Sequence, residues 1–411
     1  MILPFAQELY EQMMDNKQLF RDHLDLLYQE YGELFPEEMS SGYHLHDCRA
    51  SKKLKGLLIR RIKLKQADQQ GKEIVLSIQP SFVMPYMTGL TEEVEKALFL
   101  TQYGVPLSAL TYVFGHNDQY WYRLMTQFGR YGLVETSIQQ AEKVPQHLLA
   151  DEKHSRINGE KCYIATTCGD DCVLGTSISM SADEAGLRAA YSDFKEEVTA
   201  FAPQYAPQTV NTDGWAATQK AWLTLFTTIT IIECFLHAFI SIRSRCKKKF
   251  KAVWPQIQEQ VWNIYKATDS DSFLAQIAHF HIWANAHIDG TALKAVEKLC
   301  KKANRFVLWY DHPQARRTSN MLDRLMLPMD RWLTHRRYFH GHLISAEKSI
   351  RSWALVKNFA PYCPRSKLSH AWISPAHKLN GKLYHQNWLH NLLISTSGSP
   401  VFTFSHKNQQ N

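Results

Sequence analysis

Residues 146–180 carry the stretch that decides the fold, QHLLADEKHSRINGEKCYIATTCGDDCVLGTSISM. Apolar and β-branched residues fall into three short runs here, at 146–151, 161–167 and 172–180. Gly169-Asp170-Asp171 supplies turn residues between the last two runs. Short runs of this composition, bounded by turn residues, predict three β-strands in hairpin succession.

Downstream of this stretch the periodicity predicts a helix over 182–200 and a strand at 209–212. A helix over 215–226, a strand over 227–234 and a basic helix over 235–251 complete the set. Three hairpin strands, a helix, and two strands joined by a helix are the element order of an RNase H-like fold. The sequence therefore predicts an α/β RNase H-like core.

Upstream, three helical segments are expected from Thr91 onward, over 107–114 and over 118–128. A helix, a glycine turn, a short helix and a last helix with a polar face form the layout of a helix-turn-helix, whose last helix enters the DNA major groove. On that interpretation Arg123 and Gln127 contact bases or phosphates. The alternative is an ordinary three-helix packing unit.

Charge is unevenly distributed along the chain of 411 residues, whose net charge is +8. Residues 1–40 carry nine acids and two bases, with apolar residues at helical spacing, whereas the other 371 residues carry 45 bases and 30 acids. Residues 51–66 and 72–79 predict two basic strands, which could follow a phosphate backbone or form a solvated hairpin face. An excess of positive charge suits a polyanionic partner.

Two aspartates stand at the ends of expected strands. Asp151 ends the first strand and Asp213 ends the fourth, and the expected strand order makes them neighbours across the centre of the sheet. Phosphoryl transfer by two metal ions needs carboxylates that converge from different strands. Each aspartate alone is a weak signal, but the pair fits that chemistry.

Several short motifs around these aspartates match one family. They are Ala150-Asp151-Glu152, Tyr163-Ile164-Ala165, Val173-Leu174-Gly175, Thr212-Asp213-Gly214, Cys234-Phe235-Leu236-His237 and Thr318-Ser319-Asn320-Met321-Leu322-Asp323-Arg324. Residues 140–360 thus resemble a DDE transposase of the Mutator-like group, which includes many prokaryotic insertion-sequence transposases. The Cys-x-x-His pair, 21 residues after the second aspartate, is the most specific of these motifs.

The third acid is where the chain departs from the family pattern, which has glutamate after Thr-x-Asn. Asp323 occupies that position, and we favour it as the third metal ligand. The rival is Glu347, which follows Ser345 at an expected helix start. Either acid could instead serve as an ordinary helix N-terminal residue, where negative charge is favoured.

The resemblance implies a transposase that cuts DNA and joins strands at the ends of its mobile element, with two Mg²⁺ ions that Mn²⁺ can replace. It also implies a homodimer or larger assembly on double-stranded DNA, at terminal inverted repeats and target, in the cytoplasm of a prokaryote and associated with the nucleoid. Two alternatives are a DNA-binding protein with an inactive core and a metal-dependent nuclease without strand transfer.

With this resemblance, six regions are expected: an acidic helical segment, basic strands with a helix-turn-helix, the first part of the core, an all-α insertion, the end of the core with the third acid, and a loosely structured tail. Their bounds are 1–50, 51–140, 141–251, 252–316, 317–363 and 364–411.

Clustered bases around the last acid predict a DNA-binding surface, because a solvated face would normally mix bases with acids. Residues 301–367 hold 14 bases against four acids. The expected DNA contacts are Lys247, Lys248, Lys249, Arg316, Arg317, Arg336 and Arg337.

Three further residues lie near the expected site. Cys234 and His237 are better explained as a buried thiol and an imidazole under the site than as zinc ligands, because no second ligand pair has zinc spacing. Trp215 either stacks on a flipped base or fills the core. The apolar run 221–242 contains Glu233, so no membrane span and no membrane partner are expected.

Overall fold

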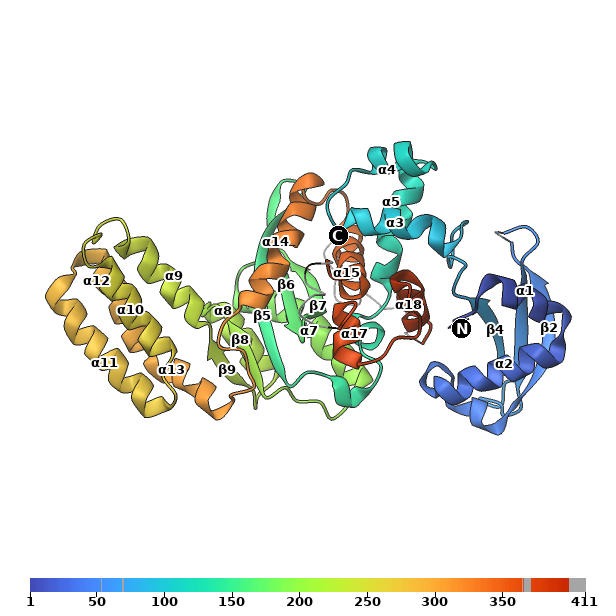
Figure 1. The fold of residues 1–411 in the computed structure, drawn as a ribbon, viewed down its shortest axis with the longest axis horizontal. Coiled ribbons are helices and arrows are strands. Elements are labelled where there is room, and N and C mark those ends of the chain that lie inside the picture. The colour runs from blue at the N-terminus through green and yellow to red at the C-terminus, as the bar shows by residue number, and fades with distance from the viewer. Residues whose placement is uncertain (53, 69, 364, 366–370, 399–411) are drawn as a thin grey trace.

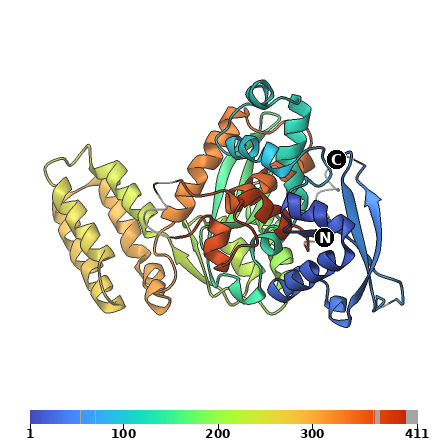
Figure 2. The ribbon, with the colours of Figure 1, turned by 45° about the vertical axis from the view of Figure 1, so that its right-hand side comes forward.

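The computed structural model describes residues 1–52, 54–68, 70–363, 365 and 371–398. A mixed α/β core occupies the middle of the molecule, with a bundle of helices at one end and a second α/β unit, built from the N-terminal residues, at the other (Figure 1). The two ends project in opposite directions from the core (Figure 2).

Five strands form the central sheet in the order β7-β6-β5-β8-β9. The first three strands along the chain are antiparallel neighbours, and β5, β8 and β9 are parallel. All five predicted strands are therefore confirmed, although β5 continues six residues past its expected end. The strands are β5 (His147–Ile157), β6 (Glu160–Gly169), β7 (Cys172–Ser179), β8 (Thr209–Thr212) and β9 (Thr230–Glu233).

Helices cover both faces of this sheet. On one face lie α7 (Glu184–Phe201) and α8 (Ala216–Leu225), which pack on each other. Helix α14 (Asn320–His335) packs against β5. With both faces covered, the sheet is shielded from solvent, and every residue of the edge strand β7 is buried, including its serines and threonine.

Helix α15 (Leu343–Phe359) lies along β7, the edge strand of the sheet. The side chain of Asn358 accepts a hydrogen bond from the amide of Val173 and donates one to its carbonyl, both at 2.8 Å. Glu347 accepts from the amide of Ile178 at 2.6 Å. These side chains satisfy backbone groups that an uncovered edge strand would expose.

The predicted all-α insertion forms a bundle with its own hydrophobic core, separate from the main one. The expected start at residue 252 is wrong, because Phe235, Ile242 and Cys246 of α9 already belong to that core. Apolar residues at helical spacing, such as Phe273, Ile277, Phe280 and Ala284, face that core. The bundle consists of α9 (Phe235–Cys246), α10 (Trp254–Tyr265), α11 (Ser270–His287), α12 (Gly290–Lys301) and α13 (Ala303–Val307).

The expected boundary at residue 50 is wrong, because β2 (Tyr43–Ala50) pairs with the basic strand β3 (Leu58–Leu64). The acidic helices and basic strands thus belong to one unit, whose sheet has the order β1-β4-β3-β2. Its other elements are β1 (Ile2–Leu3), β4 (Val75–Pro80), α1 (Gln7–Asp15) and α2 (Lys17–Glu30).

Three packed helices occur where the sequence predicts them, namely α3 (Thr91–Thr101), α4 (Leu107–Phe114) and α5 (Asp118–Thr126). Gly115 ends α4 with a φ of 75°, a conformation that glycine adopts without strain. Short α6 (Leu133–Ser137) follows. Single 3₁₀ turns occur at Gly32–Leu34, Glu37–Ser41, Gln127–Arg130, Ala141–Lys143 and Leu308–Asp311.

The expectation of a loosely structured C-terminal tail is wrong for residues 371–398. Helices α17 (Pro375–Asn380) and α18 (Trp388–Ser395) are ordered, and α18 is almost entirely buried against the main core. The hydroxyl of Ser397 accepts a hydrogen bond from the amide of Ile2 at 2.6 Å. The sequence signal was present in the apolar residues of 388–394, but the surrounding histidines and polar residues obscured it.

In the part of the chain that the structure describes, no helix is long and apolar enough to cross a membrane. The run 221–242 is divided among α8, β9 and α9 instead. All eight cysteines are free thiols.

Candidate active site

The parallel register of the central sheet brings the first two aspartates together. Leu149 on β5 pairs with Asn211 on β8, so the next alternate positions along both chains are Asp151 and Asp213. Asp213 directly follows the last residue of β8, and its Oδ1 accepts a hydrogen bond from the amide of Trp215 at 2.8 Å. The two aspartates therefore follow the same paired segment of adjacent strands, and Asp213 acts electrostatically on Asp151.

Alternation along β5 decides which face Asp151 occupies, because successive side chains of a strand point to opposite faces. Glu152 points toward α7 and α8, where its Oε1 accepts hydrogen bonds from the hydroxyls of Tyr191 at 2.8 Å and Thr218 at 2.7 Å. Burial raises the pKa of Glu152 to about 7. Asp151 consequently lies on the opposite face.

Helix α14 covers the face of Asp151 and carries Asp323 in its first turn. Lys153, two residues after Asp151, forms an ion pair with Asp330 of α14 at 2.7 Å, which fixes the helix on this face. Burial, and then the neighbouring charge of Asp213, raise the pKa of Asp151 to about 6, and Asp323 adds to the same effect. Asp213 and Asp323 are therefore both near enough to Asp151 to disfavour its ionised form, and we call these three residues the aspartate cluster.

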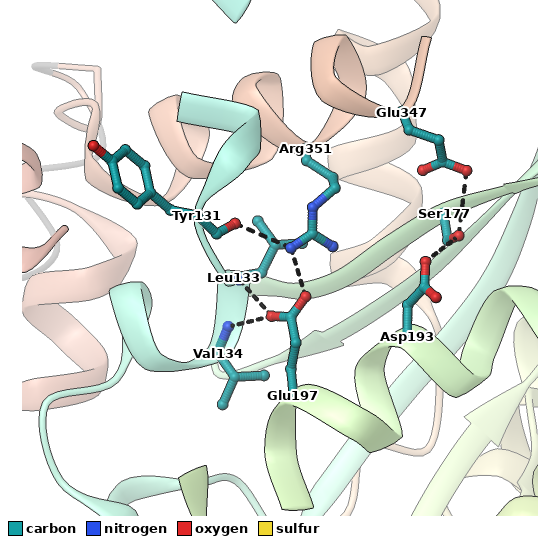
Figure 3. A network of polar contacts seen from close by, with 8 residues as sticks. All are labelled: Tyr131, Leu133, Val134, Ser177, Asp193, Glu197, Glu347 and Arg351. Atoms are coloured by element: carbon teal, nitrogen blue, oxygen red, sulfur yellow. Dashed lines mark hydrogen bonds and ion pairs between the residues drawn. The ribbon is translucent and has the colours of Figure 1, made fainter. Parts of the chain in front are cut away.

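Glu347, the rival for the third acid, lies elsewhere. It is fully buried on α15, with hydrogen bonds from the Ile178 amide and, at 3.4 Å, from the Ser177 hydroxyl. Those contacts hold α15 along the edge of the sheet (Figure 3).

Cys234 and His237 come from the junction of β9 and α9, next to the aspartates. A hydrogen bond with Cys234, together with the charges of Asp213 and Asp323, raises the pKa of His237 to about 9. Burial alone would raise the pKa of the Cys234 thiol, but hydrogen bonds with His237 and Ser319 lower it. Ser319 immediately precedes α14, so its hydrogen bonds with the Cys234 thiol connect the start of α14 to the end of β9.

One further acid, Glu233, is buried beside Asp213, and basic side chains balance its charge. Its carboxylate pairs with Lys302 and lies 3.6 Å from Arg305, both from the helical bundle. Gly214 separates it from Asp213 and has a φ of 91°. A Cβ on Gly214 would lie only 2.3 Å from Oε1 of Glu233, so the site requires glycine here. No spacing in the sequence indicates these ion pairs, because their members are 69 and 72 residues apart.

The expected DNA contacts divide into exposed and packed side chains. Arg123 on α5, the three lysines that follow α9, and Arg316 and Arg337 are exposed. Arg316 also lies 3.4 Å from Asp171. The three lysines are Lys247, Lys248 and Lys249.

The three other residues expected to contact DNA pack against the protein itself. Gln127 is only 7 % exposed, so it cannot reach DNA in this conformation. Arg317 lies among five aromatic rings, with Trp309 nearest at 4.8 Å, and Arg336 lies 4.5 Å above the ring of Trp332. Such cation–π packing stabilises the fold and removes these cations from a DNA surface.

Trp215 packs against the main core, with its ring centroid 6.0 Å from that of Tyr163. It is half-buried, which favours the core interpretation over stacking on a flipped base.

The donor chemistry of the aspartate cluster suits a hard divalent cation, because Mg²⁺ prefers carboxylate and water oxygens. Across the described ranges, however, no three His, Cys, Asp or Glu side chains form a group close enough to hold a metal ion. Mg²⁺ usually keeps several waters and takes only one or two carboxylates together with substrate phosphates. The coupled but separated carboxylates fit that mode of binding.

Neither the scan against protein-family models nor the search of curated proteins finds a match for this chain. We therefore infer the function from the geometry of the site.

The raised pKa of Asp151 leads to a stability prediction. Its folded-state pKa of about 6 lies above the ordinary 3.8, so the neutral form stabilises the fold at low pH and this contribution is lost as pH rises through 6. Asp151→Asn should therefore be more stable than the unaltered protein at pH 8, by about 1–3 kcal/mol, and similar to it near pH 4. Urea unfolding with EDTA at both pH values measures this, and a difference that does not change with pH would contradict it.

Proposed function

We propose that this chain is a DNA transposase with an RNase H-like core, in which Asp151, Asp213 and Asp323 bind the catalytic metal ions. The observation that carries the proposal is that Asp213, after β8, and Asp323, at the start of α14, both act electrostatically on Asp151 of β5, although the three residues are far apart in sequence. The strand order β7-β6-β5-β8-β9 supports it, with its antiparallel hairpins and parallel crossovers.

Two Mg²⁺ ions, when bound, supply the activation of a water nucleophile and the stabilisation of the leaving 3′-oxygen. The protein's own contribution is to hold the carboxylates in place. Asp213 is oriented by the amide of Trp215, and Asp151 by the amide of Glu152 at 2.8 Å. Burial, together with the charges of Asp213 and Asp323, raises the pKa of Asp151, and a bound cation would favour its ionised form again.

The partner of this site is double-stranded DNA, at the ends of the mobile element and at the target. Exposed cations, including Lys247 and Arg316, lie on elements next to the aspartates. Helix α5, with exposed Arg123, is the candidate DNA-recognition helix of a helix-turn-helix. Joining two ends in one reaction requires a dimer or a larger assembly, and binding should weaken steeply with salt.

The test is nicking of a labelled duplex that carries the element's ends, with Mg²⁺ or Mn²⁺ and with EDTA as the blank. We expect cation-dependent nicks at the ends and joined products with target DNA. Asp213→Asn is the matched control, because it removes charge without changing size and identifies any contaminating nuclease.

Two outcomes would replace the proposal. Binding of the ends without nicking, with either metal, would favour a DNA-binding protein with an inactive core. Nicking that never yields joined strands would favour a nuclease of the same fold.

A further inference from the structure

A small cavity of about 90 Å³ opens beside the aspartate site. Pockets for drug-sized ligands occupy roughly 300–1,000 Å³, so this one suits a small group. It lies where the sheet meets the helical bundle, and α9 and α12 supply most of its walls. Its polar lining consists of Asp213 and Glu233 from the ends of β8 and β9, His237 and Ser241 from α9, and Lys298 and Lys302 from the C-terminal end of α12.

The two lysines of this cavity differ in their partners. Lys302 forms an ion pair with Glu233, which also lies near Arg305. Lys298, one turn earlier on α12, is exposed and forms no ion pair with any described residue. Lys298 is therefore a cation available to a ligand, placed at the mouth of a cavity that reaches Asp213.

Ser241 adds a hydrogen-bond donor. Its hydroxyl oxygen accepts a hydrogen bond from Nη1 of Arg245 at 2.8 Å, and within the described ranges the hydroxyl proton has no acceptor. A hydroxyl that accepts from a cation is a better donor to an anion. The exposed guanidinium of Arg245 also adds positive charge behind it.

We propose that Lys298 and Ser241 bind a backbone phosphate of the DNA strand next to the scissile phosphodiester. This inference rests on the proposed function, since it takes DNA to be the substrate of the aspartate site. A lysine serves as a point charge for phosphate, and a hydroxyl fixes the orientation of the group. The helical bundle then acts as a part of the active site that sets the position of the strand relative to Asp213.

The experiment compares Lys298→Ala with Lys266→Ala, in the full chain, on the duplex carrying the element's ends. Lys266 is the matched control because it is an exposed lysine of the same bundle that lines a different groove, with Gln260 and His279. Loss of one phosphate contact should weaken binding about tenfold and lower the slope of log K against log salt by about 1. Lys298→Arg should recover most of the affinity, whereas Lys266→Ala should change neither quantity.

Methylphosphonate substitution then locates the phosphate. A neutral linkage next to the cleavage position should weaken binding by the unaltered protein but cause no further loss in Lys298→Ala, because the contact is already absent. Additive losses at every position, or equal DNA binding by Lys298→Ala and Lys266→Ala, would overturn the inference. The proposed function would still stand in that case, provided that the unaltered protein nicks the DNA and Asp213→Asn does not. Absence of DNA binding by the unaltered protein would overturn both.

Discussion

Asp323→Asn is expected to abolish metal-dependent nicking of DNA, by roughly 10²–10³-fold or more, while Glu347→Gln leaves nicking intact. Both substitutions replace a carboxyl group by an amide with almost no change in volume. The difference arises from position, because Asp323 belongs to the cluster with Asp151 and Asp213, and Glu347 holds the edge of the sheet.

Binding should separate the two roles further. Asp323→Asn should bind the DNA ends at least as tightly as the unaltered protein in EDTA, because a carboxylate that repels phosphate has been removed. Glu347→Gln should keep its nicking rate and lose stability, since a charge-assisted hydrogen bond to the Ile178 amide becomes a neutral one. Nicking that survives in Asp323→Asn and is lost in Glu347→Gln would move the third ligand to α15.

The core of this fold could be predicted because its signals are local. Short β-branched runs and turn residues such as Gly169 define each strand, and Asp213 is visible in the sequence as an aspartate directly after a strand. Asp151, expected at a strand end, lies inside β5 instead. Helices α3, α4 and α5 could also be predicted, because Thr91 and the glycine turns mark their ends.

The features that could not be predicted from the sequence depend on contacts between residues that are far apart in the chain. Arg317 and Arg336 count as basic in any sequence, but their aromatic partners come together only on folding. The pairing of Glu233 with Lys302 joins residues 69 positions apart, and the packing of α18 under α15 depends on tertiary burial. Charge and hydropathy patterns do not contain that information.

Arg351→Met is expected to destabilise the protein by about 3–5 kcal/mol, because it leaves a buried carboxylate without its counter-ion. Arg351 on α15 is fully buried and donates from Nη2 to Oε1 of Glu197 at 2.5 Å and to the carbonyl of Tyr131 at 3.0 Å. Glu197 on α7 lies in the middle of this network, with α15 on one side and the start of α6 on the other (Figure 3).

The second oxygen of Glu197 explains why this pair matters to the assembly of the whole core. It accepts hydrogen bonds from the amides of Leu133 and Val134, the first two residues of α6, at 2.5 and 3.1 Å. Burial raises the pKa of Glu197 even though Arg351 opposes that effect. Without the guanidinium, the carboxylate takes up a proton or recruits water, and either change weakens the link between α6, α7 and α15.

Arg188→Met is the matched control. Arg188 pairs with Glu184 one turn away on the solvent side of α7, at 2.9 Å, and such exposed pairs contribute only about 0.2–1 kcal/mol. Urea unfolding should place Arg351→Met well below the unaltered protein and Arg188→Met close to it. The double variant Arg351→Met/Glu197→Gln should recover part of the loss, because it no longer buries an unpaired charge. If Arg351→Met were as mild as Arg188→Met, the ion pair would contribute nothing to holding α15 on the core.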